Sequence, residues 1–313
     1  MTEVKQYDVI IIGAGPAGMT AATYASRADL KTVMLDQGIY GGQMNNTAEV
    51  ENYPGYNSIM GPDLAEKMYA SSTQFGAEYS FGMITGVEIL AKNEKLVHTD
   101  MGDFQAPALI IATGSEHIHL GVDGEEEYQG KGVSYCAVCD GAFFKGESVA
   151  VVGGGDSAVE EGLYLADVVK DVTVYVRDNK LKAQPILQQR AKKQENMHFV
   201  WNTEVTAIEG DGEAVSQLKL HNNQTGEDQV VDKSGIFIYV GLKPNTQVFE
   251  NLGITDDHGW IKTDDKMATA VPGIFAAGDV RAKNLRQITT AVGDGGLAGQ
   301  EAYQYVAELK SEA

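Results

Sequence analysis

Residues Tyr7–Gly18 read YDVIIIGAGPAG, a short apolar run followed at once by the pattern G-x-G-x-x-G. The apolar run predicts a buried parallel strand. Residues 19–26 are typical of a helix, and residues 31–35 predict a second strand that ends at Asp36. A βαβ unit that binds a dinucleotide has these parts in the same order: strand, glycine loop, helix, strand and acid.

The three glycines of this loop have separate tasks in such a unit. Gly13 allows the tight turn, Gly15 lets the backbone approach a pyrophosphate, and Gly18 lets the helix pack closely on the strand. The N-terminus of the helix then faces the anion. Asp36 is placed to accept hydrogen bonds from an adenosine ribose. Because all these parts occur in register, the sequence favours dinucleotide binding over a plain glycine turn.

The same pattern recurs 140 residues further along the chain, at Gly153–Ala158. Residues 148–152 predict a strand before it, residues 158–166 a helix after it, and residues 172–176 the next strand. Two such units imply two dinucleotide sites. The sequence therefore predicts an α/β protein with two Rossmann-like dinucleotide-binding domains.

The only two cysteines lie between these patterns, in Cys136-Ala137-Val138-Cys139-Asp140. A C-x-x-C pair tends to hold one thiol of lowered pKa, and thiolate is the species that reacts in disulfide exchange. Asp140 is placed to move the proton that exchange requires. Half of a zinc site is the alternative, but no further cysteine or H-x3-5-H pair supplies the other ligands. A purely structural disulfide is disfavoured because it would close almost no loop.

The composition narrows the class of protein. The chain has 313 residues, which suggests two domains, and 43% of them are hydrophobic. Its formal net charge of -20 makes nucleic acid a poor partner. No apolar run approaches the length of a membrane span, and the N-terminus shows no signal-peptide pattern. We therefore expect a cytoplasmic protein, in which a cysteine pair is more often catalytic than structural.

Three further expectations concern local structure. Residues 61–75 predict a helix with Pro62 in its first turn, and residues 83–99 predict two antiparallel strands. A last helix is expected at Gln287–Glu308. Four glycines between residues 293 and 299 predict that it is interrupted.

Together, these motifs resemble those of the low-molecular-weight, bacterial-type thioredoxin reductases over essentially the whole chain. Besides the two glycine patterns and C-A-x-C-D-G, the shared motifs are G-G-Q at Gly41–Gln43, V-E-N-[YFW]-P-G at Val50–Gly55, A-T-G at Ala112–Gly114, G-x-x-P-N-T at Gly241–Thr246, G-[IV]-F-A-A-G-D-V at Gly273–Val280, and R-Q at Arg286–Gln287. The resemblance implies a flavoprotein disulfide reductase that forms homodimers.

The resemblance also implies a domain plan and an electron path. A discontinuous FAD-binding domain, residues 1–116 and 244–313, would contain an inserted nicotinamide-dinucleotide-binding domain, residues 117–243, that carries the cysteine pair. Electrons would pass from NADPH through FAD to the Cys136–Cys139 disulfide, and then to thioredoxin or a thioredoxin-like protein. In this family one domain rotates against the other, through linkers that correspond here to residues 114–120 and 241–244.

Site residues follow from the same resemblance. Cys136 would attack the partner's disulfide, Cys139 would face the flavin, and Asp140 would be the acid and base. FAD, bound without a covalent link, would be held by Gly13, Gly15, Pro16, Gly18, Asp36, Gln37, Gly41, Gly42, Gln43, Asn52, Asp279, Arg286, Gln287 and Ile288. The nicotinamide dinucleotide would be held by Gly153, Gly155, Asp156, Ser157, Arg177 and Lys182. No metal site is implied.

One stretch departs from the family pattern H-R-R-D-x-x-R. Here Tyr175-Val176-Arg177-Asp178 lacks the histidine and the first arginine, and one residue is inserted before Lys182. Arginines after the second strand select NADPH by binding its 2′-phosphate. Since Arg177 remains, we expect a preference for NADPH that is weaker than in relatives, with NADH as a second donor.

Three other functions stay open on the sequence alone. A ferredoxin or flavodoxin reductase of the same fold would lack C-x-x-C, so the intact pair argues against it. A thioredoxin reductase that takes electrons from another donor, such as ferredoxin, is opposed by the intact pattern at Gly153. Only an experiment distinguishes an enzyme from a redox-sensing protein that holds FAD without turnover.

Overall fold

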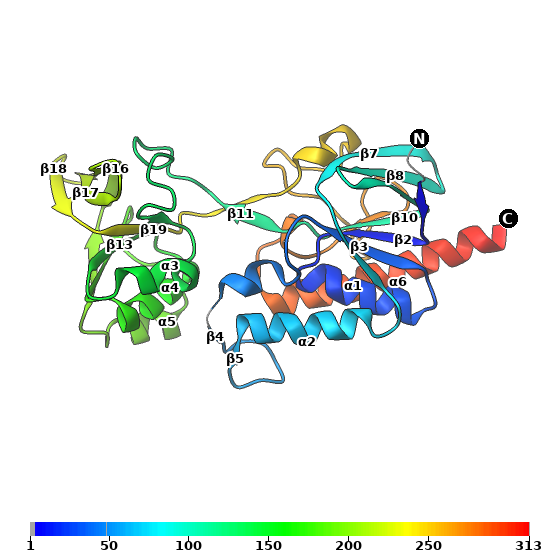
Figure 1. The fold of residues 1–313 in the computed structure, drawn as a ribbon, viewed down its shortest axis with the longest axis horizontal. Helices are drawn as coiled ribbons and strands as arrows, with labels where there is room; N and C mark the ends of the chain where they lie inside the picture. Colours follow the sequence, from blue (N-terminus) through cyan, green and yellow to red (C-terminus); the bar gives the residue numbers. More distant parts are fainter. Residues whose placement is uncertain (1–3, 48, 313) are drawn as a thin grey trace. The chain divides into compact units, whose positions relative to one another are not determined.

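The computed structural model describes residues 4–47 and 49–312. The chain forms two compact units: residues up to 116 and from 243 onward make the first, and residues 117–242 make the second. The second unit is therefore inserted in the first. Each unit contains a parallel sheet of its own, as the α/β prediction required (Figure 1).

The first unit is built on a five-stranded parallel sheet in the order β21-β10-β2-β3-β6. Its strands are β2 (Val9–Ile12), β3 (Thr32–Asp36), β6 (Glu78–Phe81), β10 (Ala108–Ile111) and β21 (Ile274–Ala276). In β2, Val9 and Ile11 face one core while Ile10 and Ile12 face another. The central strands are buried on both faces, which is why they are continuous apolar runs in the sequence.

Helices cover one face of this sheet, and a second sheet covers the other. The helices are α1 (Pro16–Arg27), α2 (Gly61–Thr73) and α6 (Ile288–Glu312), which Figure 1 shows along one side of the parallel strands. The second sheet has the order β1-β9-β8-β7 and is formed by β1 (Lys5–Gln6), β7 (Ile84–Ala91), β8 (Glu94–Thr99) and β9 (Gly102–Ala106). The antiparallel pair β7 and β8 confirms the prediction for residues 83–99.

Short elements complete the first unit. A two-stranded ribbon pairs β4 (Glu49–Val50) with β5 (Ile59–Met60) just before α2. Single turns of 3-10 helix occur at η1 (Gly42–Asn46), η3 (Gln247–Leu252) and η4 (Gly278–Val280). Two of these turns, η1 and η4, contain residues that the sequence assigned to a cofactor site.

The prediction of an interrupted last helix is wrong, because α6 runs unbroken from Ile288 to Glu312. Gly295 and Gly299 are buried against α1. A Cβ at Gly295 would clash with the carbonyl oxygen of Ala17, and one at Gly299 would lie 2.6 Å from that of Ala21. The glycines therefore permit close packing of two helices, which outweighs their low helix propensity.

The second unit repeats this plan. Its parallel sheet has the order β12-β19-β13-β14-β15. The strands are β12 (Val133–Ser134), β13 (Ser148–Val152), β14 (Asp171–Val176), β15 (Met197–Trp201) and β19 (Gly235–Ile238). The register of β13 on β14, with Val152 beside Tyr175, matches that of β2 on β3, with Ile12 beside Leu35. The two glycine patterns thus open equivalent βαβ units.

Helices again pack on one face of the sheet and an antiparallel sheet on the other. The helices are α3 (Ala137–Asp140), which continues into the 3-10 turn η2 (Gly141–Phe144), α4 (Asp156–Val168) and α5 (Pro185–Ala191). The antiparallel sheet is formed by β16 (Thr203–Gly210), β17 (Val215–Asn222) and β18 (Asp228–Asp232). Each unit therefore has separate cores on the two faces of its own sheet.

The chain crosses between the units twice, in β11 (Ser115–His117) and β20 (Leu242–Pro244), which pair with each other. The amide of Ile118 donates to the carbonyl of Gly241 at 3.0 Å. These crossings lie where the sequence predicted linkers. Rotation about them stays a prediction.

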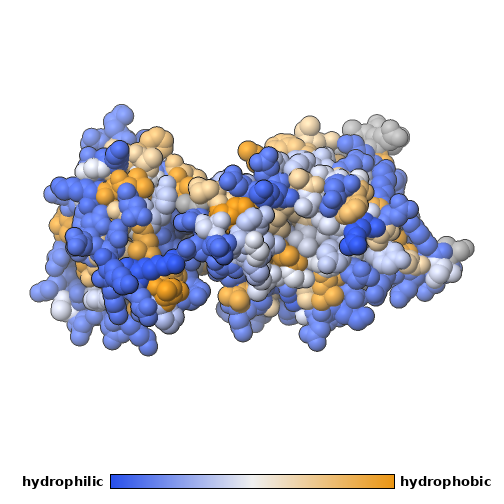
Figure 2. Space-filling view, turned by 90° about the horizontal axis from the view of Figure 1, so that it is seen from below, coloured by the Kyte–Doolittle hydropathy of each residue, from blue (hydrophilic) through white to orange (hydrophobic). Residues whose placement is uncertain are grey.

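Hydrophilic side chains predominate on the face shown in Figure 2, where apolar side chains gather in small separate groups. Among residues 4–47 and 49–312, no helix combines the length and the apolar character that crossing a bilayer requires.

Candidate active site

The two cysteines form a disulfide at the start of α3. Cys136 is the N-cap residue of this helix, and its Sγ accepts a hydrogen bond from the amide of Cys139 at 3.2 Å. The two Cα atoms are 5.4 Å apart. The predicted pairing is thus confirmed, and it leaves no thiolate free to bind zinc.

Ser134 connects the disulfide to the carboxylate of Asp140. Its Oγ accepts a hydrogen bond from the amide of Cys136 at 3.0 Å and donates to Oδ2 of Asp140 at 2.7 Å. Ser134 lies in β12 and is only 4% exposed. The sequence-predicted acid is therefore held in place next to the redox pair by a buried hydroxyl that the sequence did not single out.

Tyr239 supports the other side of the same helix. Its hydroxyl accepts a hydrogen bond from the amide of Ala137 at 3.0 Å. Burial raises the pKa of Tyr239, and the nearby carboxylates of Glu161 and Asp140 raise it further. Glu161 lies on α4, and its Oε2 is buried without a hydrogen-bond partner. A second carboxyl group therefore acts on Tyr239 from α4, and no motif indicated it.

The first glycine loop has the geometry that a dinucleotide requires. Gly13 has φ of +106°, and a Cβ there would clash with the carbonyl oxygen of Ala112. A Cβ at Gly18 would clash with the carbonyl oxygen of Gly13. By contrast, no heavy atom lies within 4 Å of the Cβ position of Gly15, at the N-terminus of α1. Open space at that helix end is where a phosphate group fits.

Asp36 lies at the end of β3, beside this loop. Its Oδ2 accepts from the amide of Ala14 at 2.7 Å and its Oδ1 from that of Gly38 at 2.9 Å. Each carboxylate oxygen has a further lone pair for a ribose hydroxyl. Pro16 opens α1. Gln37 follows Asp36 and is exposed.

Other candidate residues of the first unit lie in loops, and one of these loops meets the N-terminal end of α6. Asn52 Nδ2 donates to Oε1 of Gln287 at 3.0 Å, across 235 positions of sequence. Ile288 is the first residue of α6. Gly41 and Gly42 both have positive φ, at 109° and 56°, and lead into η1. Gln43 donates to the carbonyl of Ser115 at 3.4 Å.

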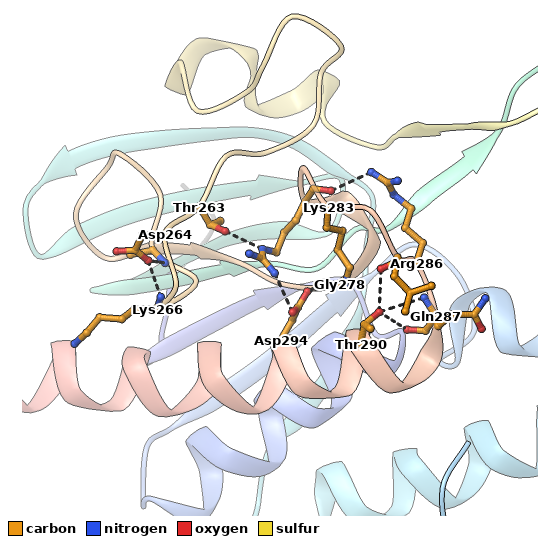
Figure 3. Close-up of polar contacts among 12 residues, drawn as sticks. Thr263, Asp264, Lys266, Gly278, Lys283, Arg286, Gln287, Thr290 and Asp294 are labelled. Carbon is orange, nitrogen blue, oxygen red and sulfur yellow. Dashed lines mark hydrogen bonds and ion pairs between the residues drawn. The ribbon is translucent and has the colours of Figure 1, made fainter. Parts of the chain in front are cut away.

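Asp279, in η4, has a buried Oδ1 without a hydrogen-bond partner. Burial raises the pKa of its carboxyl group, while Lys283 and Arg286 act in the opposite direction. Arg286 donates from Nε to the carbonyl oxygen of Asp279 at 3.2 Å (Figure 3). Its guanidinium also lies 3.5 Å from the ring centre of Trp260. An unsatisfied acceptor beside an open glycine loop fits a ligand hydroxyl, so these residues suit an FAD ribityl or ribose group.

The second glycine loop has matching geometry. Gly153 has φ of +142°, and a Cβ there would clash with the carbonyl oxygen of Tyr239, whereas the Cβ position of Gly155 is open. Asp156 accepts two hydrogen bonds from Gln184, from the amide at 2.7 Å and from Nε2 at 2.9 Å. Ser157 is exposed in the first turn of α4. A dinucleotide phosphate fits here as well.

The stretch after β14 contains both signs of charge. Val176 takes the register position that Asp36 has in the first unit, and its side chain is 3% exposed. Arg177 is exposed, with Nε 3.8 Å from the carboxylate of Glu204. Lys182 forms an ion pair with Asp178 at 2.7 Å. Both cations therefore have a carboxylate partner, and the longer contact is that of Arg177.

A C-x-x-C disulfide and two dinucleotide-type folds are the marks of the pyridine nucleotide-disulphide oxidoreductases, and residues 7–295 match that family. Thioredoxin reductases of Listeria monocytogenes and Bacillus subtilis are 60% and 54% identical to this chain, each over 99% of it and over 97% and 98% of their own lengths. The crystal structure of Lactococcus lactis thioredoxin reductase matches with a TM-score of 0.95 and 53% identity, covering 96% of this chain and 99% of that one. The chain belongs to the low-molecular-weight bacterial thioredoxin reductases, which confirms the resemblance drawn from the motifs.

Proposed function

We propose that this protein passes electrons from NADPH, through FAD, to its Cys136–Cys139 disulfide and then to thioredoxin or a thioredoxin-like protein. The observation that carries the proposal is the disulfide at the start of α3, with the carboxylate of Asp140 held beside it by Ser134. The open glycine loops of both units and the family membership support it.

In this proposal the first unit holds FAD, which supplies the two-electron step between the nicotinamide and the disulfide. The phosphates would lie at the N-terminus of α1, beside Gly15. Asp36 would bind the ribose, and the unpartnered oxygen of Asp279 would accept from a further hydroxyl group. Gly41, Asn52 and the residues around Gln287 would enclose the flavin, since the fold gathers these segments in one unit.

The second unit would hold the nicotinamide dinucleotide beside Gly155, at the start of α4. Arg177 offers an exposed guanidinium for the 2′-phosphate of NADPH, and at Val176 no carboxylate occupies the position of Asp36. Because Lys182 is paired with Asp178, the second charge contact is weakened. NADPH is therefore the proposed donor, selected over NADH less strongly than in relatives with the full arginine pattern.

The chemistry at sulfur is disulfide exchange. Reduction by two electrons and two protons opens the S–S bond to a dithiol. The Cys136 thiolate attacks the partner's disulfide and forms a mixed disulfide, which Cys139 then attacks, so that the partner leaves as a dithiol. Asp140 is the proposed group that takes and returns the proton at this site.

The proposed partner is a protein rather than a small disulfide. Phe143 follows the redox helix and is 83% exposed, which is unusual for a large apolar side chain. Aromatic side chains are enriched at protein interfaces. We also propose that the protein acts as a homodimer, as its resemblance to the family implies, and that it works in the cytoplasm.

The flavin spectrum tests the proposal. Protein purified as the native chain, or reconstituted with FAD, is expected to be yellow, to bleach under anaerobic conditions with NADPH, and to recover its colour when oxidised thioredoxin is added. The values of kcat/KM for NADPH and NADH then measure donor preference. Protein that takes up no FAD would contradict the proposal. If reduced ferredoxin bleaches the flavin and neither NADPH nor NADH does so, the electron donor is not a nicotinamide dinucleotide.

A further inference from the structure

Asp294 of α6 is the centre of a buried charge cluster at one end of η4 (Figure 3). Its Oδ2 accepts from the amide of Gly278 at 3.0 Å and from Nζ of Lys283 at 2.8 Å, and its Oδ1 pairs with Nη1 of Arg281 at 2.9 Å. The three charged side chains are only 12–14% exposed. At such burial, removal of one charge leaves its partners poorly solvated.

These contacts hold both sides of Asp279. Gly278 precedes it and has φ of +78°, a conformation that only glycine adopts readily. A Cβ at Gly278 would lie 2.8 Å from the Cβ of Ala17, in the first turn of α1. Asp294 therefore fixes the turn against the helix end that carries the first glycine loop.

Asp279 itself is poised between these groups. Its own carboxylate has a buried oxygen without a partner, and both Lys283 and Asp294 influence its charge. A buried acceptor without a hydrogen-bond partner destabilises the folded protein. It persists here because the surrounding contacts hold the turn. The cost is recovered when a ligand donates to that oxygen.

We propose that Asp294 is a positioning residue for the FAD of the first unit: it neutralises Arg281 and Lys283 and anchors Gly278, so that the carboxylate of Asp279 stays available to the cofactor. The inference rests on the proposed binding of FAD. Lys283 also acts on the charge of Asp279, whose carboxylate is therefore within its reach once the charge of Asp294 is removed. Lys283 would then pair with Asp279 in competition with the ligand.

A double-mutant cycle tests this inference. FAD is titrated into the apoproteins of wild type, Asp294→Asn, Asp279→Asn and the double variant, and its dissociation constant is read from flavin fluorescence. Loss of one charge-assisted contact predicts that Asp294→Asn weakens FAD binding by about 10- to 100-fold. In the Asp279→Asn background the same change should weaken FAD binding by less than about 3-fold, since Asp294 acts through Asp279.

The matched control is Glu301→Gln on the same helix. Glu301 is 15% exposed and forms an ion pair with Lys266 at 3.4 Å. It resembles Asp294 in being a carboxylate paired with a cation, but its partner lies in the loop at residues 264–266 and not near η4. We expect FAD binding by this variant to stay within about 3-fold of wild type. The absorption and circular dichroism bands of saturating bound FAD should change in Asp294→Asn only.

Equal losses of affinity in both backgrounds would overturn the inference, because they would show a general structural effect. Unchanged affinity in Asp294→Asn with a lowered melting temperature of the apoprotein would overturn it in the same way. Should Asp294→Asn fail to fold, Asp294→Ser takes its place in the same cycle, with the same coupling expected, because it also removes the charge that holds Lys283. Wild-type apoprotein that takes up no FAD would instead overturn the proposed function, and this inference with it.

Discussion

At the scale of single residues, Glu161 shows how the fold changes the chemistry of a side chain. Burial raises its pKa from 4.5 to about 7, and the neighbouring Glu160 adds to the effect. Tyr239, directly after β19, and Asp140, in α3, act on the same region and provide no positive charge. Between pH 4.5 and 7 the folded protein therefore binds more protons than the unfolded chain, so its stability falls as the pH rises through that interval.

Glu161→Gln should remove this dependence, because a neutral amide has no charged form to bury. The variant is expected to match wild type near pH 4.5 and to become more stable by up to about 3 kcal/mol at pH 7 and above. Urea unfolding at several pH values measures the gap. Since the comparison at pH 4.5 serves as its own control, a gap of constant size would show that packing, and not titration, separates the two proteins.

At the scale of elements, the joint between α1 and α6 depends on small residues. Gly295→Ala should destabilise the first unit by about 1–3 kcal/mol, because the new methyl group meets the carbonyl of Ala17. Gly293 lies on the same helix, is exposed, and has open space at its Cβ position, so Gly293→Ala should stabilise by up to about 1 kcal/mol. Thermal unfolding of the two variants compares them directly. A gain in stability from both would show that α6 is not pressed against α1.

The same elements show what the sequence could predict. The strands around Gly13 and Gly153 and the pairing of Cys136 with Cys139 were predictable, since their signals are local and periodic. The unbroken course of α6 was not, because it depends on packing against α1, near the other end of the sequence. The contact of Tyr239 with Ala137 was not predictable for a related reason, because it joins residues 102 positions apart. In parallel sheets, distant strand ends share one edge, so such partners leave no local pattern.

At the scale of the whole molecule, the chain joins two units whose cores are separate. The cores around β2 and β10 draw only on the first unit, and those around β13 and β14 only on the second. The disulfide belongs to the second unit and the proposed FAD site to the first. A change at sulfur should therefore leave the fold of the first unit intact, and the proposed reaction should divide into two half-reactions that can be measured separately.

That division yields the last prediction. Cys136→Ser and Cys139→Ser are each expected to abolish thioredoxin reduction, because exchange needs both sulfurs. Reduction of the flavin by NADPH should persist at a rate close to that of wild type, because no sulfur takes part in it. Asp140→Asn keeps both sulfurs, so it should only slow the thiol step, by on the order of 100-fold if the carboxylate moves the proton. Stopped-flow absorbance follows flavin bleaching, and insulin reduction through thioredoxin follows the second half. Loss of flavin reduction in either serine variant would mean that the disulfide also shapes the nicotinamide step, and undiminished thioredoxin reduction would remove these cysteines from the electron path.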